Sequence, residues 1–141
     1  MLQGADTSQH VFGLLPDAHA NHHIFAADGE GAQAIIDLLA QSRSELNGQI
    51  TVVYADTGPQ GEDFALRLCK QEVDRVLVMP TVLAAVGLLS RLIEAARIGA
   101  RIYAAGTGTL IDLVVQLAAA RGLDPMSVMA EVRPAAGDAP T

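Results

Sequence analysis

Two short glycine-bearing segments carry the residue types and spacing that best suit the binding of a phosphate group. Each follows an apolar run and precedes a helical pattern: the first glycine loop is Asp28, Gly29, Glu30 and Gly31, and the second glycine loop is Gly106, Thr107, Gly108 and Thr109. Glycine leaves backbone N–H groups bare at the positive end of a helix, where phosphate binds. The sequence therefore predicts that these residues contact a phosphate-bearing cofactor.

Both loops also have a purely structural interpretation. On this interpretation, the glycines of the first loop are needed only because a tight turn between a strand and a helix requires their backbone freedom. In the second loop, Thr107 or Thr109 can be the N-cap of the following helix, because a threonine oxygen accepts a hydrogen bond from a helix N–H group. Asp28 and Glu30 could instead hold a metal-bridged phosphate, but two acids alone do not form a metal site.

Asp56 is a further candidate, because it follows the β-branched run that ends at Ala55. Dinucleotide-binding folds place an acid near this point, where it binds ribose hydroxyls and disfavours the 2′-phosphate of NADP. If a nucleotide binds, we therefore expect NADH rather than NADPH. The alternative is a turn residue that precedes Gly58 and Pro59.

Strand and helix patterns alternate along the chain. Strands are expected at 22–27, 50–55, 75–79, 101–105 and 128–132, and helices at 31–44, 62–71, 82–98 and 109–120. Thr81 is expected to cap the third helix and Gly99 to end it. This alternation predicts an α/β fold with three layers: a doubly wound, mainly parallel, five-stranded sheet of the Rossmann-like type, with helices on both faces.

Ligands of such sheets bind beyond the carboxyl ends of the strands, at the point where the strand order reverses. If the first and fourth strands are neighbours at that point, both glycine loops flank one crevice. We expect this arrangement, and no other group of residues in the sequence suggests a catalytic centre.

The composition predicts one domain at 21–133, with a flexible arm at 1–20 and a disordered tail at 134–141. The 141 residues carry a net charge of −7, which disfavours nucleic acid and anionic membranes as partners. The longest apolar stretch, 82–98, contains charged side chains and therefore predicts a soluble helix rather than membrane insertion. The amino terminus has no secretion-signal pattern, so we expect a cytoplasmic protein, and the apolar composition allows a homo-oligomer.

The single cysteine, Cys69, excludes a disulfide within the chain and is expected to be a small buried side chain. His19, His22 and His23 gather near the first strand, where neighbouring side chains point to opposite faces. We therefore expect a partly exposed cluster and not a metal site. No catalytic residue, flavin site or metal site is assigned.

The segments together resemble the nicotinamide-nucleotide-binding half of ferredoxin–NADP reductase-type flavoenzymes, including their siderophore-interacting, ferric-reductase relatives. The resemblance covers about 22–133 and rests on 25–35 (FAADGEGAQAI), 102–108 (IYAAGTG), 117–123 (LAAARGL) and the last strand, 128–132. It implies the same fold and a site for NAD(H). This chain departs from the family pattern at Glu30, at Thr107 and in lacking the flavin-binding barrel.

Two functions follow from this sequence. In the first, a stand-alone reductase-like domain binds a pyridine dinucleotide, with NADH favoured, and works in a redox system with a flavoprotein partner that carries the flavin on another chain. In the alternative, a degenerate reductase-like domain has lost catalysis and serves as a structural or regulatory protein-binding subunit. On either hypothesis the chain is not a complete enzyme on its own.

Overall fold

The computed structural model describes residues 14, 17, 19–58, 61–96, 99–123 and 127–133. Its centre is a parallel sheet of five strands in the order β3-β2-β1-β4-β5. The strands are β1 (His22–Asp28), β2 (Gln49–Ala55), β3 (Arg75–Met79), β4 (Ala100–Gly106) and β5 (Val128–Val132). The predicted α/β class and the parallel five-stranded sheet are confirmed.

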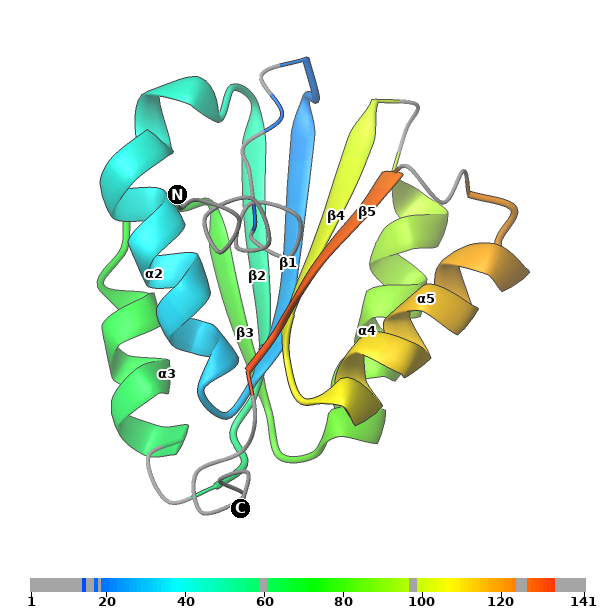
Figure 1. Cartoon of the computed structure of the whole chain (residues 1–141). Coiled ribbons are helices and arrows are strands. Elements are labelled where there is room, and N and C mark those ends of the chain that lie inside the picture. Colours follow the sequence, from blue (N-terminus) through cyan, green and yellow to red (C-terminus); the bar gives the residue numbers. More distant parts are fainter. Residues whose placement is uncertain are drawn as a thin grey trace, which may run out of the picture.

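Helices cover both faces of this sheet. They are α2 (Gly31–Ser42), α3 (Gly61–Cys69), α4 (Val82–Ala95) and α5 (Gly108–Ala120), and a short 3₁₀ turn, η1 (Arg43–Glu45), follows α2. In Figure 1, α2 and α3 lie on one side of the sheet and α4 and α5 on the other. The molecule therefore has the three layers that the alternating pattern predicts.

The sheet separates two apolar cores. Phe25, Tyr54 and Tyr103 are fully buried on the side of α2 and α3. Ile24 and Ile102 belong to the core on the side of α4 and α5. Because successive side chains of a strand point to opposite faces, a strand covered on both faces must be apolar throughout. This explains why the inner strands read as continuous apolar runs.

The end of α4 differs from the sequence prediction. The helix ends at Ala95, and Ala96 has the extended backbone angles φ −73° and ψ 148°. Gly99 instead serves the turn into β4: its φ is +104°, and a Cβ atom there would lie 2.9 Å from Asn21 Nδ2. Thr81 does cap α4, since its side chain accepts a hydrogen bond from the N–H of Ala84.

The prediction for Cys69 is wrong, and the expectation of a partly exposed histidine cluster holds for His19 and His22 but not for His23. Cys69 is exposed, because Phe64 and Leu68 take the buried face of the short helix α3. His23 is fully buried, whereas His19 is exposed and His22 is half-buried. The three histidines therefore do not share one environment.

Most of the arm expected at 1–20 and all of the tail expected at 134–141 lie outside the described residues. Of the arm, Leu14 and Ala20 are buried, with 8% and 7% of their surfaces exposed. Among the described residues, no helix is long and apolar enough to cross a membrane.

Candidate functional site

Both glycine loops lie at the carboxyl edge of the sheet, where the strand order reverses. β1 and β4 are direct neighbours, with Ala27 opposite Ala105 in their register. The first loop follows β1 and the second follows β4, at the lower edge of the sheet in Figure 1. The structure thus brings the two loops together at the ligand-binding position of open α/β sheets.

Asp28 ties the two loops to each other. Its Oδ1 accepts a hydrogen bond from the backbone N–H of Thr107 at 2.8 Å, and its Oδ2 accepts one from the Thr107 hydroxyl, also at 2.8 Å. Only 2% of Asp28 is exposed. The carboxylate is therefore built into the fold, and it positions the second loop against the first.

Glycine is required at two points because the loops pack so closely. A Cβ atom on Gly31 would lie 2.0 Å from the carbonyl oxygen of Ala105. A Cβ atom on Gly106, whose φ is +142°, would lie 1.9 Å from Asp28 Oδ1. At these points the Ala105 backbone and the Asp28 carboxylate fill the space between the loops, so a ligand must approach from beyond the strand ends.

The second loop presents the start of α5 to solvent. Thr107 is the N-cap, since its Oγ1 accepts a hydrogen bond from the N–H of Leu110 at 3.3 Å. Gly108 and Thr109 follow it and are exposed. Because the first N–H groups of a helix have no partner within the helix, those of Gly108 and Thr109 are donors for an incoming anion.

The first loop is held from β2. The Tyr54 hydroxyl donates to the carbonyl oxygen of Gly29 at 2.9 Å. Burial, with a smaller contribution from Asp56 and the other nearby carboxylates, raises the pKa of Tyr54 above its usual value, so this hydroxyl stays a donor. Glu30 occupies the N-cap position of α2, where its side chain makes no capping hydrogen bond.

Asp56 lies one residue beyond β2 at the same edge. Its N–H donates to the carbonyl oxygen of Met79 at 2.8 Å. Its carboxylate lies against the start of α3, because a Cβ atom on Gly61 would come within 2.0 Å of Asp56 Oδ1. Since β2 pairs with β1, Asp56 is beside the first loop and is separated from the second by β1.

The structure adds Arg133 and Glu131, which sequence reasoning missed. The N–H of Arg133 donates to the carbonyl oxygen of Gly106 at 2.6 Å, and its Nε donates to Glu131 Oε2 at 2.5 Å. Among the described basic residues, Arg133 is the one that directly follows the carboxyl end of a strand. Assigning 128–132 as the neighbour of 101–105 would have found it.

The described part of the chain contains no group of three or more His, Cys, Asp or Glu residues that could hold a metal ion. The candidate site consists of the two glycine loops, the start of α5, Asp56 and the Arg133–Glu131 pair.

Comparison with solved structures finds the same fold in parts of several longer chains. CYP116B46 from Tepidiphilus thermophilus is 24% identical with a TM-score of 0.58, covering 87% of this chain and 15% of that one. The H286L mutant of ferredoxin–NADP⁺ reductase from Plasmodium falciparum is 17% identical with a TM-score of 0.54, covering 80% and 52%. The siderophore-interacting protein SipS from Aeromonas hydrophila is 15% identical with a TM-score of 0.52, covering 87% and 53%.

These matches confirm, at the level of the fold, the predicted resemblance to the ferredoxin–NADP reductase and siderophore-interacting type. This chain spans about half of the ferredoxin–NADP⁺ reductase and SipS chains and 15% of the CYP116B46 chain. No curated protein sequence matches it. Residues 7–128 match the family described as dimethylamine monooxygenase subunit DmmA-like, N-terminal domain, and the chain therefore belongs to this family.

Proposed function

We propose that this domain binds a pyridine dinucleotide at the carboxyl edge of its sheet and takes part in a redox system whose flavin is carried by another chain. The observation that carries the proposal is the contact of two glycine loops at the point where the strand order reverses. Membership in a monooxygenase-subunit family and the fold of ferredoxin–NADP⁺ reductase support a redox role.

Backbone groups would supply most of the contacts to the pyrophosphate. The exposed start of α5, at Gly108 and Thr109, offers two N–H donors, and the helix dipole favours a negative charge there. Among the described basic residues, Arg133 is the one that directly follows a strand at this edge, but its Nε is already bonded to Glu131. We therefore expect an affinity that depends only weakly on salt concentration.

Asp56 supports NADH over NADPH. Its place one residue beyond β2 is where a carboxylate can accept hydrogen bonds from the ribose hydroxyls of a nucleotide that lies over the first loop. The same negative charge would repel the 2′-phosphate of NADPH. Replacing Asp56 with Asn should therefore reduce the preference for NADH.

The domain would orient the nicotinamide, while the two cofactors carry out the hydride chemistry. No catalytic acid, base or nucleophile is proposed in this chain. The flavoprotein would approach the same carboxyl edge, because the nicotinamide must be within reach of the flavin.

Calorimetric titration with NADH and with NADPH at millimolar concentration tests the proposal. The blocking variant is Gly108→Val: apart from the chain neighbours and the backbone of α5 itself, no atom lies within 4 Å of a Cβ atom built on Gly108, so a side chain there extends into open space where the ligand would meet it. Gly87→Val, at an exposed site of α4 that is equally open, is the matched control. We expect NADH to bind the parent chain and the Gly87→Val variant, and to bind Gly108→Val at least tenfold more weakly.

The second candidate is a structural or regulatory subunit that has lost nucleotide binding. The buried carboxylate of Asp28 between the loops and the uncapped Glu30 beside them favour it, since both place negative charge where phosphate would lie. A folded chain that binds neither nucleotide at millimolar concentration would support this candidate and contradict the first.

A further inference from the structure

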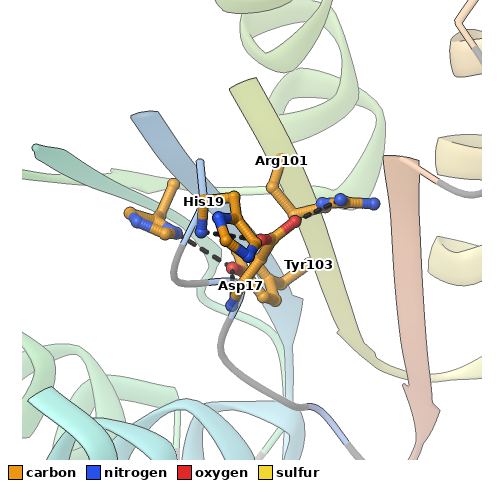
Figure 2. Close-up of polar contacts among 5 residues, drawn as sticks. Asp17, His19, Arg101 and Tyr103 are labelled. Carbon is orange, nitrogen blue, oxygen red and sulfur yellow. Dashed lines mark hydrogen bonds and ion pairs between the residues drawn. The ribbon is translucent and has the colours of Figure 1, made fainter. Parts of the chain in front are cut away.

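Two described residues before β1, Leu14 and Asp17, contact the sheet on the side of α2. We call Leu14, Asp17, His19 and Ala20 the amino-terminal strap; it ends one residue before Asn21, which leads into β1. The carboxylate of Asp17 pairs with Arg101 at the start of β4, as Figure 2 shows. Farther along, the N–H of Leu14 donates to Glu131 Oε1 on β5 at 3.3 Å, and the Leu14 side chain is buried in the adjoining core.

One hydroxyl joins this strap to the interior. The N–H of Asp17 donates to the Tyr103 hydroxyl oxygen at 3.1 Å, and that oxygen lies 2.9 Å from His23 Nδ1. Tyr103 also stacks on Phe25, with the ring centroids 4.4 Å apart, so its hydroxyl has little freedom to move. Figure 2 shows the Asp17–Tyr103 contact beside the Asp17–Arg101 pair.

The directions of these hydrogen bonds follow from the chemistry of the partners. The other ring nitrogen of His23, Nε2, lies 2.9 Å from the carbonyl oxygen of Asn47, which can only accept. In the neutral imidazole Nε2 therefore carries the hydrogen and Nδ1 accepts. The Tyr103 hydroxyl must donate to His23 Nδ1, which leaves its oxygen free to accept the N–H of Asp17.

A second proton on the His23 ring is incompatible with these hydrogen-bond directions. Nδ1 would then carry hydrogen and point it at the Tyr103 oxygen, so the hydroxyl would lose its acceptor. The proton would also place a charge on a side chain that is fully buried. A buried unpartnered donor and a buried charge are both costly, and opening the strap toward solvent relieves both.

The surrounding charges do not reverse the preference of the buried His23 side chain for its neutral form. Burial lowers the pKa of His23 most strongly, and His22 and Arg43 lower it further, whereas the Asn47 carbonyl and Asp17 raise it. Burial raises the pKa of Tyr103 to about 12, so its hydroxyl remains protonated while the histidine titrates. The carboxyl of Asp17 has a lowered pKa, chiefly because it accepts the N–H of His19, and thus stays charged.

We propose that the amino-terminal strap is a pH-sensitive latch, held on β4 by the Tyr103 hydroxyl while His23 is neutral and released when His23 takes up a proton. Its far end is the Leu14–Glu131 contact, and Glu131 also holds Arg133 beside the second glycine loop. Release of the strap therefore changes the partners of Glu131 at the edge of the candidate site. The latch does not depend on nucleotide binding.

Amide hydrogen exchange of the whole chain, followed residue by residue by NMR, tests the latch. The reporter is the N–H of Asp17, and the core amides of Val53 and Ile102 report global unfolding. After correction for intrinsic rates, we expect the opening constant at Asp17 to rise between about pH 7 and about pH 5, by up to about tenfold for each pH unit. Asp17 should open more readily than the core amides throughout.

His23→Gln is the decisive variant, because a glutamine amide keeps a donor and an acceptor but does not titrate in this range. It should abolish the rise at Asp17. His22→Gln is the matched control: His22 lies on the opposite face of β1, where its Nε2 contacts Thr51 Oγ1 at 3.2 Å, and its loss should leave the rise intact. Tyr103→Phe removes the hydroxyl and should open the strap already at neutral pH.

Two results would overturn the latch. One is exchange at Asp17 that matches the core amides at every pH, which would mean that the strap opens only with global unfolding. The other is the same pH dependence in His23→Gln as in the parent chain. If His23→Gln does not fold, closed and protected behaviour of Asp17 in Tyr103→Phe at neutral pH contradicts the proposal on its own.

Discussion

Gly106 and Gly108 lie two residues apart in the second glycine loop, but their surroundings differ. Gly106→Ala would bring a Cβ atom within 1.9 Å of Asp28 Oδ1 at a φ of +142°. Strain and overpacking together should lower the free energy of unfolding by about 2–4 kcal/mol. Gly108→Ala meets no atom within 4 Å and should change it by less than about 0.5 kcal/mol. Urea denaturation of both variants measures the difference, and equal effects would contradict the close packing of the loops.

The Thr107 hydroxyl caps α5 and donates to Asp28. A substitution that keeps the size of the side chain can remove both hydrogen bonds. Thr107→Val keeps the shape but removes the oxygen that caps α5 and the hydroxyl that donates to Asp28. Loss of the cap and of a partner for a buried carboxylate should destabilise the fold by about 2–3 kcal/mol. Thr107→Ser keeps both hydrogen bonds and should recover most of that loss. A thermal or urea denaturation series that shows no recovery in the serine variant would rule out the hydroxyl as the cause.

Single residues show which parts of the site the sequence could supply. The glycines, Asp28 and Thr107 were all named as candidates from their types and positions. Their mutual contacts were not, because a hydrogen bond between residues 79 positions apart depends on strand order. Arg133 was missed for the same reason, because its hydrogen-bond partner, Gly106, lies on another strand.

At the scale of elements, α4 contains a glycine that neither close packing nor the backbone conformation requires. Gly87 lies on the exposed face of this helix, with ordinary helical φ and no atom within 4 Å of a Cβ atom. Gly87→Ala should therefore stabilise the domain by about 0.5–1 kcal/mol, through lower chain entropy in the unfolded state.

Gly122, just after α5, is the control for that prediction. Its surroundings are equally open, but its φ is +78°, which the closing turn of the helix requires. The N–H of Leu123 returns to the carbonyl oxygen of Ala118 across this turn. Gly122→Ala should be destabilising by about 1 kcal/mol, so that opposite signs in calorimetric unfolding identify backbone conformation as the cause.

Elements were predicted well where their signals are local. The strands at 75–79 and 128–132 have the expected bounds, and the N-cap Thr81 was identified correctly. The end of α4 was misplaced because a glycine that follows a helix can either cap it or serve the next turn. At Gly99, contact with Asn21, which is distant in sequence, decides between the two.

For the whole molecule, the fully buried His23 and the half-buried His22 predict how stability depends on pH. Burial lowers the pKa of both His22 and His23 below the value of 6.5 that an unfolded chain has. The folded state therefore binds fewer protons, and its full stability is present above pH 6.5 and is lost as the pH falls below it. The free energy of unfolding should decrease by up to about 1.4 kcal/mol per pH unit for each histidine.

Denaturant unfolding at several pH values between about 7 and 5 measures this dependence. The double variant with His22→Gln and His23→Gln should show a much shallower slope over the same range. A slope that the double variant leaves unchanged would assign the pH dependence to other groups.

The sequence by itself determined the class of the fold, the approximate elements and the two loops. Apolar periodicity, glycine and cap residues act over a few positions, so one chain segment is enough to read them. Only the tertiary structure decided that the loops touch, that Asp28 joins them and that His23 is buried against Tyr103. These features depend on which strands become neighbours, and strand order is set by packing over the whole sheet rather than by any local pattern.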